Sequence, residues 1–309
     1  MKIVLYGGAG FIGSELADYF LARGHVVTIA DAERRVARLQ NLNPELFKAA
    51  DVWLTDTQQS LPVADVLVHL AWTTTPATSM SDIEKDIEDN IISSVCLFRE
   101  AVQRGIGKII FCSSGGAVYG NAGRKVIESR APSPVSAYGI NKLCVERYLD
   151  VIAQSSGMPA VSLRLANPYG SYQLRGTPIG AIATFLRNIQ AGEPIRLWGD
   201  GEIRRDYIHV YDVCAAFDRV ISSSTIQSGV YNVGTGESRS LNEIVSRVSA
   251  ATGKTAAVEF LSARDFDVSE ISLDASKLTC VTGWLPEISL EQGINEVYES
   301  GQKILASRP

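Results

Sequence analysis

The chain has 309 residues, of which 46% are apolar and 20% are charged. This length predicts two compact units or one large one, and the apolar share excludes an intrinsically disordered chain. The net charge of −5 and the pI of about 5.4 exclude a general electrostatic attraction to nucleic acid or anionic membranes. No apolar run reaches the roughly 18–20 residues of a membrane span. The sequence therefore predicts neither nucleic acid nor a membrane among the partners.

Cysteine and histidine are sparse in this sequence. The 5 cysteines occur singly, without a C-x-x-C pair, and the 3 histidines lie far apart. This spacing predicts no metal site, and an odd number of cysteines is typical of a reducing compartment. The chain enters a structured motif within its first few residues, which leaves no room for a signal peptide. We therefore expect a cytoplasmic protein.

Strands and helices alternate through the first half of the chain. Short apolar runs predict buried strands, and apolar residues three or four apart predict helices. The predicted elements are a strand at 2–6, a helix at 11–23, strands at 25–30 and 66–70, a helix at 83–104, a strand at 108–112, a helix at 136–156 and a strand at 160–165. Such alternation indicates βαβ units and a parallel sheet with right-handed crossovers.

The pattern changes after about residue 167, where glycine and proline become denser. Helices are predicted near 180–191, 211–221 and 240–252, between short strands. No internal repeat, low-complexity stretch or flexible linker separates the two halves. We therefore expect an α/β fold in which a second unit packs directly on the first.

The first motif is a glycine-rich turn between a predicted strand and a predicted helix. Gly7, Gly10 and Gly13 fit the spacing G-x-x-G-x-x-G, which lets the backbone approach a pyrophosphate closely. The N-terminus of the helix then offers N–H groups and the positive end of its dipole to the phosphates. An ordinary glycine-rich turn is the alternative, and the strand–turn–helix context favours dinucleotide binding.

The second predicted strand is followed by Asp31. A carboxylate in this position accepts hydrogen bonds from the ribose hydroxyls of an adenosine and repels a 2′-phosphate, which favours NAD over NADP. Arg34 and Arg35 follow closely and weaken this argument, because an arginine in this turn can bind the extra phosphate. Asp56 lies in a later turn, where contact with the adenine edge and simple solvation are both open.

Tyr138 and Lys142 are four residues apart on the predicted helix 136–156, and so lie on one face. At about 4 Å and an effective dielectric of about 20, the ammonium attracts a phenolate by about 4 kcal/mol. This attraction equals roughly three pK units on an ordinary tyrosine value near 10. The pair therefore predicts a tyrosine that acts as a general base near neutral pH.

An ordered series of segments now identifies a family. The segments are G-G-A-G-F-I-G (7–13), Asp31, H-L-A (69–71), Asn90, S-S-G-G-A-V-Y-G (113–120), Y-G-I-N-K (138–142), R-L-A-N-P-Y-G (164–170), G-D-G-E-I-R-R-D-Y-I-H-V-Y-D-V (199–213), Y-N-V-G (231–234) and R-D-F-D (264–267). They cover nearly the whole chain, which resembles an extended short-chain dehydrogenase/reductase of the NAD-dependent nucleotide-sugar epimerase/dehydratase type.

The resemblance implies a doubly wound, Rossmann-type domain over residues 1–167, joined by part of 207–235, that holds NAD. It also implies a smaller α/β domain, mainly residues 168–309, that holds a nucleoside-diphosphate sugar, and a homodimer formed through a four-helix bundle. The predicted NAD contacts are Gly7, Gly10, Phe11, Ile12, Gly13, Asp31, Asp56, Leu70, Ala71, Thr74, Asn90, Tyr138 and Lys142.

In this family, the residues that match Tyr138 and Lys142 are the catalytic tyrosine and a lysine that contacts the nicotinamide ribose. A serine or threonine four residues before the tyrosine of V-Y-G usually bridges the catalytic tyrosine and the sugar 4-hydroxyl. That position is Gly115 here, so we expect it beside Tyr138. Ser114 is the predicted catalytic substitute, with Ser113, Thr74 or a water as alternatives.

The positions after Gly115 bear on the type of reaction. The family's dehydratases carry an aspartate and a glutamate there, which expel the C6 hydroxyl. This chain has Gly116 and Ala117 instead. Without an acid, 4,6-dehydration has no chemical agent, and we do not expect it.

The substrate side of the resemblance lies mostly in the second half of the chain. Asn167, Arg205 and Arg264 match residues that hold the diphosphate, for which the guanidinium fork is well suited. Alternatively, Arg205 forms an ion pair with Asp206 or Asp212, and Arg264 forms one with Asp265 or Asp267. Two further predictions are that Asp267 binds the nucleoside and that Ile271 helps to gate the hexose pocket.

These residues together predict a UDP-sugar 4-epimerase that holds NAD and oxidises C4 of the sugar transiently. The main alternative is a nucleoside-diphosphate 4-keto-sugar reductase that uses NAD(P)H and the same Tyr138 and Lys142. A third hypothesis is a non-catalytic protein that senses NAD. Gly115 is the one feature that favours this third hypothesis.

Overall fold

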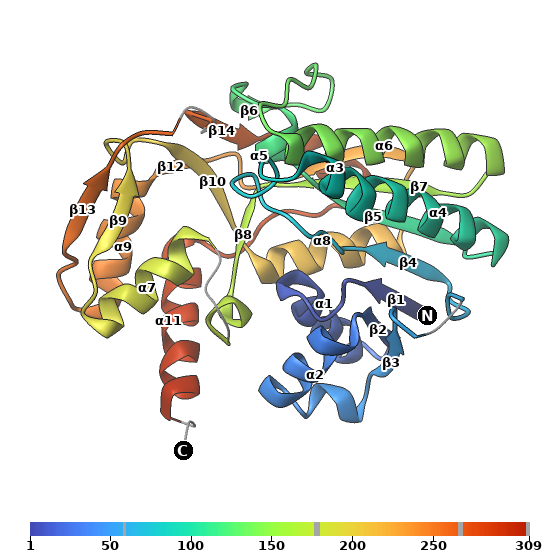
Figure 1. Ribbon diagram of the computed structural model, residues 1–309, viewed down its shortest axis with the longest axis horizontal. Helices are drawn as coiled ribbons and strands as arrows, with labels where there is room; N and C mark the ends of the chain where they lie inside the picture. The colour runs from blue at the N-terminus through green and yellow to red at the C-terminus, as the bar shows by residue number, and fades with distance from the viewer. Residues whose placement is uncertain (58–59, 176–179, 265–267, 307–309) are drawn as a thin grey trace.

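The computed structural model describes residues 1–57, 60–175, 180–264 and 268–306. Figure 1 shows a large sheet with helices on both of its faces, next to a smaller unit that holds short strands and the C-terminal helix. Within these described ranges, no helix combines the length and the apolar character that crossing a membrane requires.

The large sheet has seven strands in the order β11-β7-β5-β4-β1-β2-β3. The strands are β1 (Lys2–Tyr6), β2 (Val26–Asp31), β3 (Asp51–Leu54), β4 (Val66–His69), β5 (Lys108–Ser114), β7 (Ala160–Leu165) and β11 (Gly229–Val233). Every neighbouring pair is parallel. The order reverses between β1 and β4, and the carboxyl ends of strands at such a reversal form a ligand crevice. The predicted Rossmann-type sheet is confirmed.

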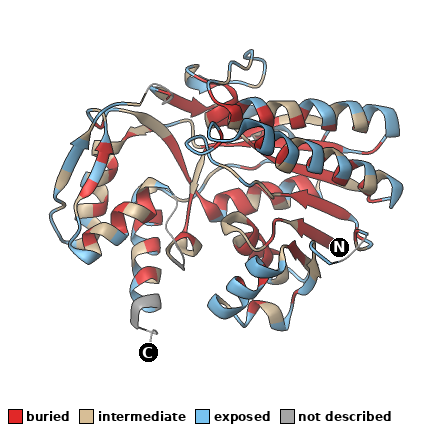
Figure 2. Ribbon diagram, viewed as in Figure 1, coloured by how far each residue is buried: buried red, intermediate tan, exposed pale blue. Residues whose placement is uncertain are grey.

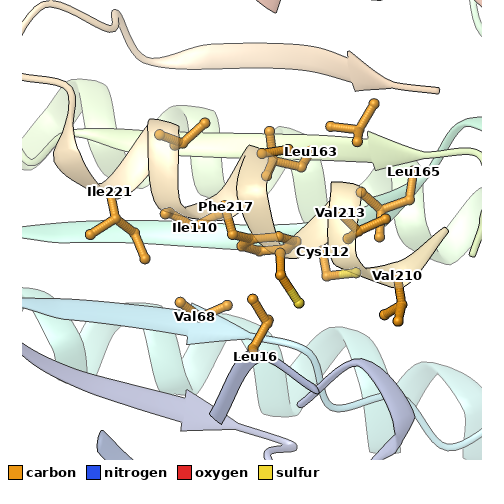
Figure 3. Close-up of a cluster of buried hydrophobic side chains, with 14 of the residues drawn as sticks. Leu16, Val68, Ile110, Cys112, Leu163, Leu165, Val210, Val213, Phe217 and Ile221 are labelled. Atoms are coloured by element: carbon orange, nitrogen blue, oxygen red, sulfur yellow. The ribbon is translucent and has the colours of Figure 1, made fainter. Parts of the chain in front are cut away.

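Side chains of the central strands alternate between the two faces of this sheet. On β5, Ile110 and Cys112 enter one apolar cluster, whereas Ile109 and Phe111 enter the other. The helices around the sheet are α1 (Phe11–Leu21), α2 (Glu33–Leu42), α3 (Ile83–Asp86), α4 (Ser93–Gln103), α6 (Ala137–Ser156) and α8 (Val210–Ser222). Figure 3 shows α8, with Phe217, lying against the face that carries Ile110 and Cys112. Helices α4 and α6 cover the opposite face.

The helix predicted at 83–104 differs from the structure in one respect. A π-helix, η2 (Ile87–Ile92), separates α3 from α4. The extra residue per turn in such a segment shifts the side chains that follow, and π-helical turns are frequent at functional sites. Three elements between β2 and β4 were not predicted, namely α2, the 3₁₀ turn η1 (Leu46–Lys48) and β3.

The smaller unit contains a sheet of order β12-β10-β14-β6, with β8 paired to β10, and a separate pair β13-β9. Its strands are β6 (Gly123–Val126), β8 (Asn167–Tyr169), β9 (Ile195–Trp198), β10 (Arg204–His209), β12 (Ser238–Ser240), β13 (Val258–Leu261) and β14 (Glu270–Leu273). Its helical segments are η3 (Ser171–Arg175), α7 (Ala181–Ala191), α9 (Leu241–Thr252) and α11 (Leu290–Ala306). Two further helices are α5 (Gly115–Val118), which connects β5 of the large sheet to β6 of the smaller unit, and α10 (Ser276–Thr282), which follows β14.

The chain crosses between the two units more than once. Helix α8 packs on the large sheet and β11 joins its edge, although both follow residue 167. In the other direction, β6 leaves the first half of the chain to pair with β14. Figure 2 shows that the strands of the large sheet are mostly buried and that the outer faces of its helices are exposed. These crossings bring the carboxyl ends of β5 and β7 against the smaller unit.

Candidate active site

A cavity of about 400 Å³ lies at the carboxyl ends of β1 and β4. Of the predicted NAD contacts, it is lined by Gly7, Gly10, Phe11, Ile12, Gly13, Asp31, Leu70, Ala71 and Asn90. A Cβ on Gly7 would collide with the backbone of Ala71, and Gly7 has a φ of +88°, so only glycine allows this close approach. No side chain caps α1 at Gly10, and its first N–H groups suit an anionic group. These residues fit a dinucleotide.

Asp31 is buried at the end of β2 and faces this cavity. One carboxylate oxygen accepts the Ala9 N–H at 3.0 Å and the other accepts the Ala32 N–H at 2.8 Å. Burial raises the pKa of Asp31 above its ordinary value, and these hydrogen bonds oppose the rise. A carboxylate has about four acceptor sites, so Asp31 holds the glycine-rich turn and can still accept ribose hydroxyls. Arg35 also lines the cavity, with Nε 3.9 Å from the Asp31 carboxylate.

Four predicted cofactor residues do not line this cavity, namely Asp56, Thr74, Tyr138 and Lys142. Asp56 is exposed, and its carboxylate accepts the Glu33 N–H at 3.1 Å, at the start of α2. Thr74 donates its hydroxyl to the Asp86 carboxylate at 2.6 Å. The structure thus gives Asp56 and Thr74 other partners, and their contact with the cofactor stays a prediction.

Tyr138 lies in the first turn of α6, which begins where Ser136 accepts the Gly139 N–H. The Tyr138 hydroxyl forms a hydrogen bond with the side chain of Ser114. Its ring meets the ring of Trp72 edge to face, with centroids 5.8 Å apart. Burial raises the pKa of Tyr138 well above its ordinary value, and the hydrogen bond with Ser114 counteracts only part of that rise.

Lys142 is buried one turn further along α6. Its ammonium donates to the Cys112 carbonyl oxygen at 2.8 Å and lies 3.8 Å from the centroid of the Trp72 ring. Burial lowers the pKa of Lys142 to about 8. The prediction that Lys142 by itself brings Tyr138 close to neutral pH is wrong for the protein alone. Both groups are buried, and burial disfavours the charged form of each.

The expected position of Gly115 is also corrected by the structure. A Cβ on Gly115 would point into the side chain of Leu273, 2.5 Å from its nearest δ-carbon, and not toward Tyr138. The hydroxyl that meets Tyr138 belongs to Ser114, one residue earlier at the end of β5. The site therefore has its hydroxyl at Ser114, and Gly115 no longer favours a non-catalytic protein. Dehydration stays unexpected, because neither Gly115 nor Gly116 carries an acid.

Ser113 serves a buried network that the sequence did not reveal. Its hydroxyl donates to the Glu146 carboxylate at 2.5 Å, and Arg164 binds both oxygens of that carboxylate, at 2.9 and 2.6 Å. Arg164 also lies over the ring of Tyr119, whose hydroxyl donates to Asn232 on β11. Glu146 follows Lys142 by one turn of α6. The network thus fixes the catalytic helix against β5, β7 and β11.

A second cavity of about 390 Å³ lies in the smaller unit and brings together Asn167, Arg205 and Arg264. Phe11, which lines the first cavity, also lines this one, so the two cavities adjoin. Asn167 donates to the backbone oxygen of Asp206 at 3.1 Å. One amide and two guanidinium groups around one cavity suit a diphosphate.

The ion pairs considered as alternatives for Arg205 are not favoured. The Asp206 carboxylate accepts the N–H groups of Leu273, Thr235 and Gly236, at 3.0–3.1 Å. The Asp212 carboxylate accepts two further backbone N–H groups, from residues 287 and 288. Backbone donors thus hold both carboxylates in place.

Three substrate predictions have different outcomes. The guanidinium of Arg264 lies 5.0 Å from the centroid of the Trp198 ring. The two aspartates considered as its ion-pair partners, Asp265 and Asp267, lie outside the described residues. The prediction that Asp267 binds the nucleoside therefore falls outside them as well. Ile271 is 1% exposed and packs in the main apolar core, opposite Arg205 on the neighbouring strand. It lines neither cavity, and the gating of the hexose by Ile271 stays a prediction.

Sequence reasoning missed two tryptophans at this site. Trp72 lines the first cavity and Trp198 lines the second. Each adjoins a motif that the sequence did reveal, since Trp72 follows H-L-A and Trp198 precedes G-D-G. An aromatic residue beside a binding motif is the signal that marks them, because such rings cover ligands and cations.

Comparison with known proteins places this geometry in a family. The model of the NAD dependent epimerase/dehydratase family matches residues 3–234. A dTDP-4-dehydro-6-deoxyglucose reductase of Escherichia coli is 30% identical over 306 residues, covering 96% of each chain. A UDP-glucose 4-epimerase of Mycolicibacterium smegmatis is 31% identical over 309 residues, covering 97% of this chain and 98% of its own.

The fold also agrees with solved structures. A UDP-glucose 4-epimerase of Thermotoga maritima, solved with UDP-glucose, superposes with a TM-score of 0.89 at 32% identity. The superposition covers 99% of this chain and 100% of the other. The family match over most of the chain, the Rossmann-type sheet and the two cavities agree with one another. The chain belongs to the NAD-dependent epimerase/dehydratase family.

Proposed function

We propose that this protein is an NAD-dependent nucleoside-diphosphate-sugar 4-epimerase that acts on a UDP-hexose or a UDP-N-acetylhexosamine. One observation carries the proposal. Tyr138, with its partner Ser114, packs against Trp72 in the wall of the dinucleotide cavity, and this cavity adjoins a second one that holds Asn167 and two arginines. The site thus combines a proton-transferring hydroxyl with an anchor for a diphosphate. The names of the relatives, which include UDP-sugar 4-epimerases, support this function.

The residues of the site divide the work of a 4-epimerase among them. Tyr138 takes the proton from the sugar 4-hydroxyl and later returns it, while Ser114 orients both hydroxyls. Bound NAD supplies the hydride acceptor and a positive charge that favours the phenolate form of Tyr138. Asn167, Arg205 and Arg264 hold the diphosphate while the oxidised hexose rotates and presents its other face to the cofactor. Binding energy is thus placed far from the reacting carbon, as a reaction on both faces of one sugar requires.

The division of the chain follows from this assignment. We propose that residues 1–167 with α8 and β11 form the NAD-binding domain and that 168–309 mainly bind the substrate. The cytoplasm is the proposed location, which rests on the odd number of single cysteines.

The test begins with the purified protein, desalted and then examined for bound NAD by absorbance after denaturation. UDP-glucose and UDP-N-acetylglucosamine are added separately, and the sugars are separated after the reaction. We expect bound NAD and conversion of at least one substrate to its 4-epimer without added cofactor. Tyr138→Phe is the matched control, which should retain NAD and lose conversion. Absence of conversion in the wild type, with either sugar, contradicts the proposal.

A second candidate is a 4-keto-sugar reductase, and one observation favours it. The E. coli relative named as a dTDP-4-dehydro-6-deoxyglucose reductase is similar to this chain over nearly its full length. Such an enzyme releases its cofactor in every turnover. Consumption of added NADH or NADPH by a nucleoside-diphosphate 4-keto sugar, with no conversion of UDP-glucose, favours the reductase.

We also propose that two copies of this chain form a dimer through α4, α6 and the segment before α4. These helices pack side by side on one face of the large sheet (Figure 1). Their outer sides expose large apolar residues, namely Ile83, Ile87, Ile92, Ile140, Tyr148 and Val151. A second copy of the same two helices covers this face and completes a four-helix bundle.

Val151→Asp tests this proposal, because Val151 is 63% exposed on α6. We expect the variant to be monomeric by light scattering coupled to size exclusion, whereas the wild type is a dimer. Phe260→Asp is the control, since Phe260 is 60% exposed on β13 in the smaller unit. A wild type that is monomeric throughout the micromolar range contradicts the proposed dimer.

A further inference from the structure

Asp86 carries a buried carboxylate that the proposed mechanism does not use. The residue is 1% exposed and ends α3. Its side-chain oxygens accept the Thr74 hydroxyl at 2.6 Å, the Asn90 amide at 2.6 Å and the Asn141 amide at 2.7 Å. All three donors are neutral. Among the described residues, no cationic side chain pairs with Asp86.

A buried carboxylate without a cation is costly, since hydrogen bonds from neutral groups offset its desolvation only in part. The nearest catalytic cation does not meet this need. The Lys142 ammonium binds the Cys112 carbonyl and the face of Trp72. The described residues of the chain therefore supply no positive partner for the negative charge of Asp86, and a bound ligand can provide one.

The position of Asp86 indicates where that partner binds. Asn90, one of its donors, lines the dinucleotide cavity. Asn90 also binds both the N–H and the hydroxyl of Thr73, another residue of the cavity wall. The π-helix η2 starts directly after Asp86 and turns Asn90 back toward it. Asp86 thus lies immediately behind the wall of this cavity.

The orientation of the dinucleotide then follows from chemistry. The glycine-rich turn and Asp31 define the pyrophosphate and adenosine end of the cavity. Tyr138 must reach the hydroxyl of the carbon that exchanges a hydride with the nicotinamide, so the nicotinamide lies at the Tyr138 end. Asp86 is at this end too, since it accepts the amide of Asn141, which lies between Tyr138 and Lys142 on α6.

We propose that Asp86 is an electrostatic partner of the oxidised nicotinamide, and that it sets the relative affinity of the protein for NAD⁺ and NADH. The oxidised ring carries a positive charge and the reduced ring carries none. A fixed negative charge behind the cavity wall therefore stabilises NAD⁺ relative to NADH. In an epimerase this preference favours return of the hydride to the sugar and opposes a trapped, reduced cofactor.

This role also explains a feature that is otherwise unfavourable for catalysis. In the protein alone, the charge of Asp86 opposes the phenolate form of Tyr138. Once a cationic ring lies between or beside the two groups, the charges balance. The inference rests on the proposed function, because that function places the nicotinamide next to Tyr138.

Asp86→Asn removes the charge and keeps the size of the side chain. Dissociation constants for NAD⁺ and for NADH are measured by calorimetry on the cofactor-free wild type and variant, so no turnover is needed. Unit charges about 10 Å apart interact enough, at an effective dielectric of about 20, for a roughly 10-fold effect. We therefore expect the preference for NAD⁺ over NADH to fall by roughly 10-fold. With UDP-sugar added, the variant should also accumulate more bound NADH, seen at ~340 nm, than the wild type.

Three further variants separate charge from structure. Glu84→Gln removes an exposed carboxylate from the same helix and should leave the ratio unchanged. Thr74→Val breaks one hydrogen bond to Asp86 but keeps its charge, so the ratio should stay within about twofold of the wild type. Asp86→Ser removes the charge with a smaller side chain and replaces Asp86→Asn if that variant does not fold.

The outcomes are distinct. A folded Asp86→Asn or Asp86→Ser that loses affinity for NAD⁺ and NADH equally has lost only structure, and the inference is overturned while the proposed function stands. An unchanged ratio overturns it as well. A wild type that binds neither dinucleotide removes the basis of both the inference and the proposed function.

Discussion

Gly115 and Gly116 are adjacent at the start of α5, yet the structure predicts opposite responses to the same substitution. A Cβ on Gly115 would lie 2.5 and 2.8 Å from the two δ-carbons of Leu273. Ordinary carbon contacts are about 3.5–4.0 Å, so the Leu273 side chain must move by about 1 Å. A Cβ on Gly116 meets its nearest atom, the Asn167 amide nitrogen, only at 3.9 Å. Gly115→Ala should therefore destabilise the protein, whereas Gly116→Ala should not.

The magnitude follows from the freedom that Leu273 has to move. It is 1% exposed, and its N–H donates to the Asp206 carboxylate at 3.1 Å, so neither side chain nor backbone has room. Overpacking of a filled core costs about 1–3 kcal/mol. Replacing glycine by alanine returns about 0.4–1 kcal/mol through the unfolded chain. The net loss is about 1–2 kcal/mol, or roughly 2–3 °C in the melting temperature of a chain of this size.

Thermal and urea unfolding of the two variants and the wild type measure this difference. Gly116→Ala should match the wild type or exceed it slightly. Combining Gly115→Ala with Leu273→Ala provides a stricter test, because the added methyl group then fills part of the cavity left by the shorter side chain. Equal stability of the two glycine variants, or simple additivity in the double variant, would refute the packing described here for Gly115.

Three further predictions concern the site itself. Tyr138→Phe should lower turnover by at least about 100-fold with the fold intact, since it removes the proton acceptor. A variant that keeps half of the wild-type rate would contradict the role assigned to Tyr138. Burial lowers the pKa of Lys142 to about 8 in the folded protein, whereas an ordinary lysine in the unfolded chain has a pKa of about 10.4. Between about pH 8 and 10.4 the unfolded state therefore binds more protons than the folded state, and the free energy of unfolding rises with pH. Lys142→Met should lack this gain in melting temperature, and identical pH profiles would contradict it. Asp31→Ala should weaken NAD binding and reduce the preference over NADP, measured by titration; tighter NADP than NAD binding in the wild type would instead point to Arg35.

The large sheet and its first turn follow from sequence because their signals are local. Parallel strands buried on both faces give continuous apolar runs, and the predicted strands at 2–6 and 160–165 match β1 and β7. Helix α6 is marked by the cap at Ser136 and by Gly157, whose positive φ ends it. Helix α2 was missed because it presents only two buried residues, Val36 and Leu39, to the sheet.

The details of the site depend on geometry that spacing does not encode. Counting back from Tyr119 selects Gly115, but successive residues at the end of a strand and the start of a helix point in different directions. The structure turns Gly115 toward Leu273 and leaves Ser114 at Tyr138. The charge state of Tyr138 was misjudged for a similar reason. The spacing to Lys142 reveals a shared helix face, whereas the burial of both groups depends on β5 and on Trp72, which lie far away in the chain.

The electrostatics of the site explain why its reactivity belongs to the complex and not to the chain alone. Without a dinucleotide, burial keeps Tyr138 protonated and disfavours the protonated, positively charged form of Lys142. Asp86 adds a negative charge nearby. If the proposed role of Asp86 holds, a cationic ring entering the cavity would favour the phenolate of Tyr138 and would pair with Asp86 in the same binding event. A protein arranged in this way gains little from activating Tyr138 by Lys142 alone, because a phenolate in the absence of a hydride acceptor does no chemistry. Burial of the pair thereby links proton transfer to occupancy of the cofactor cavity.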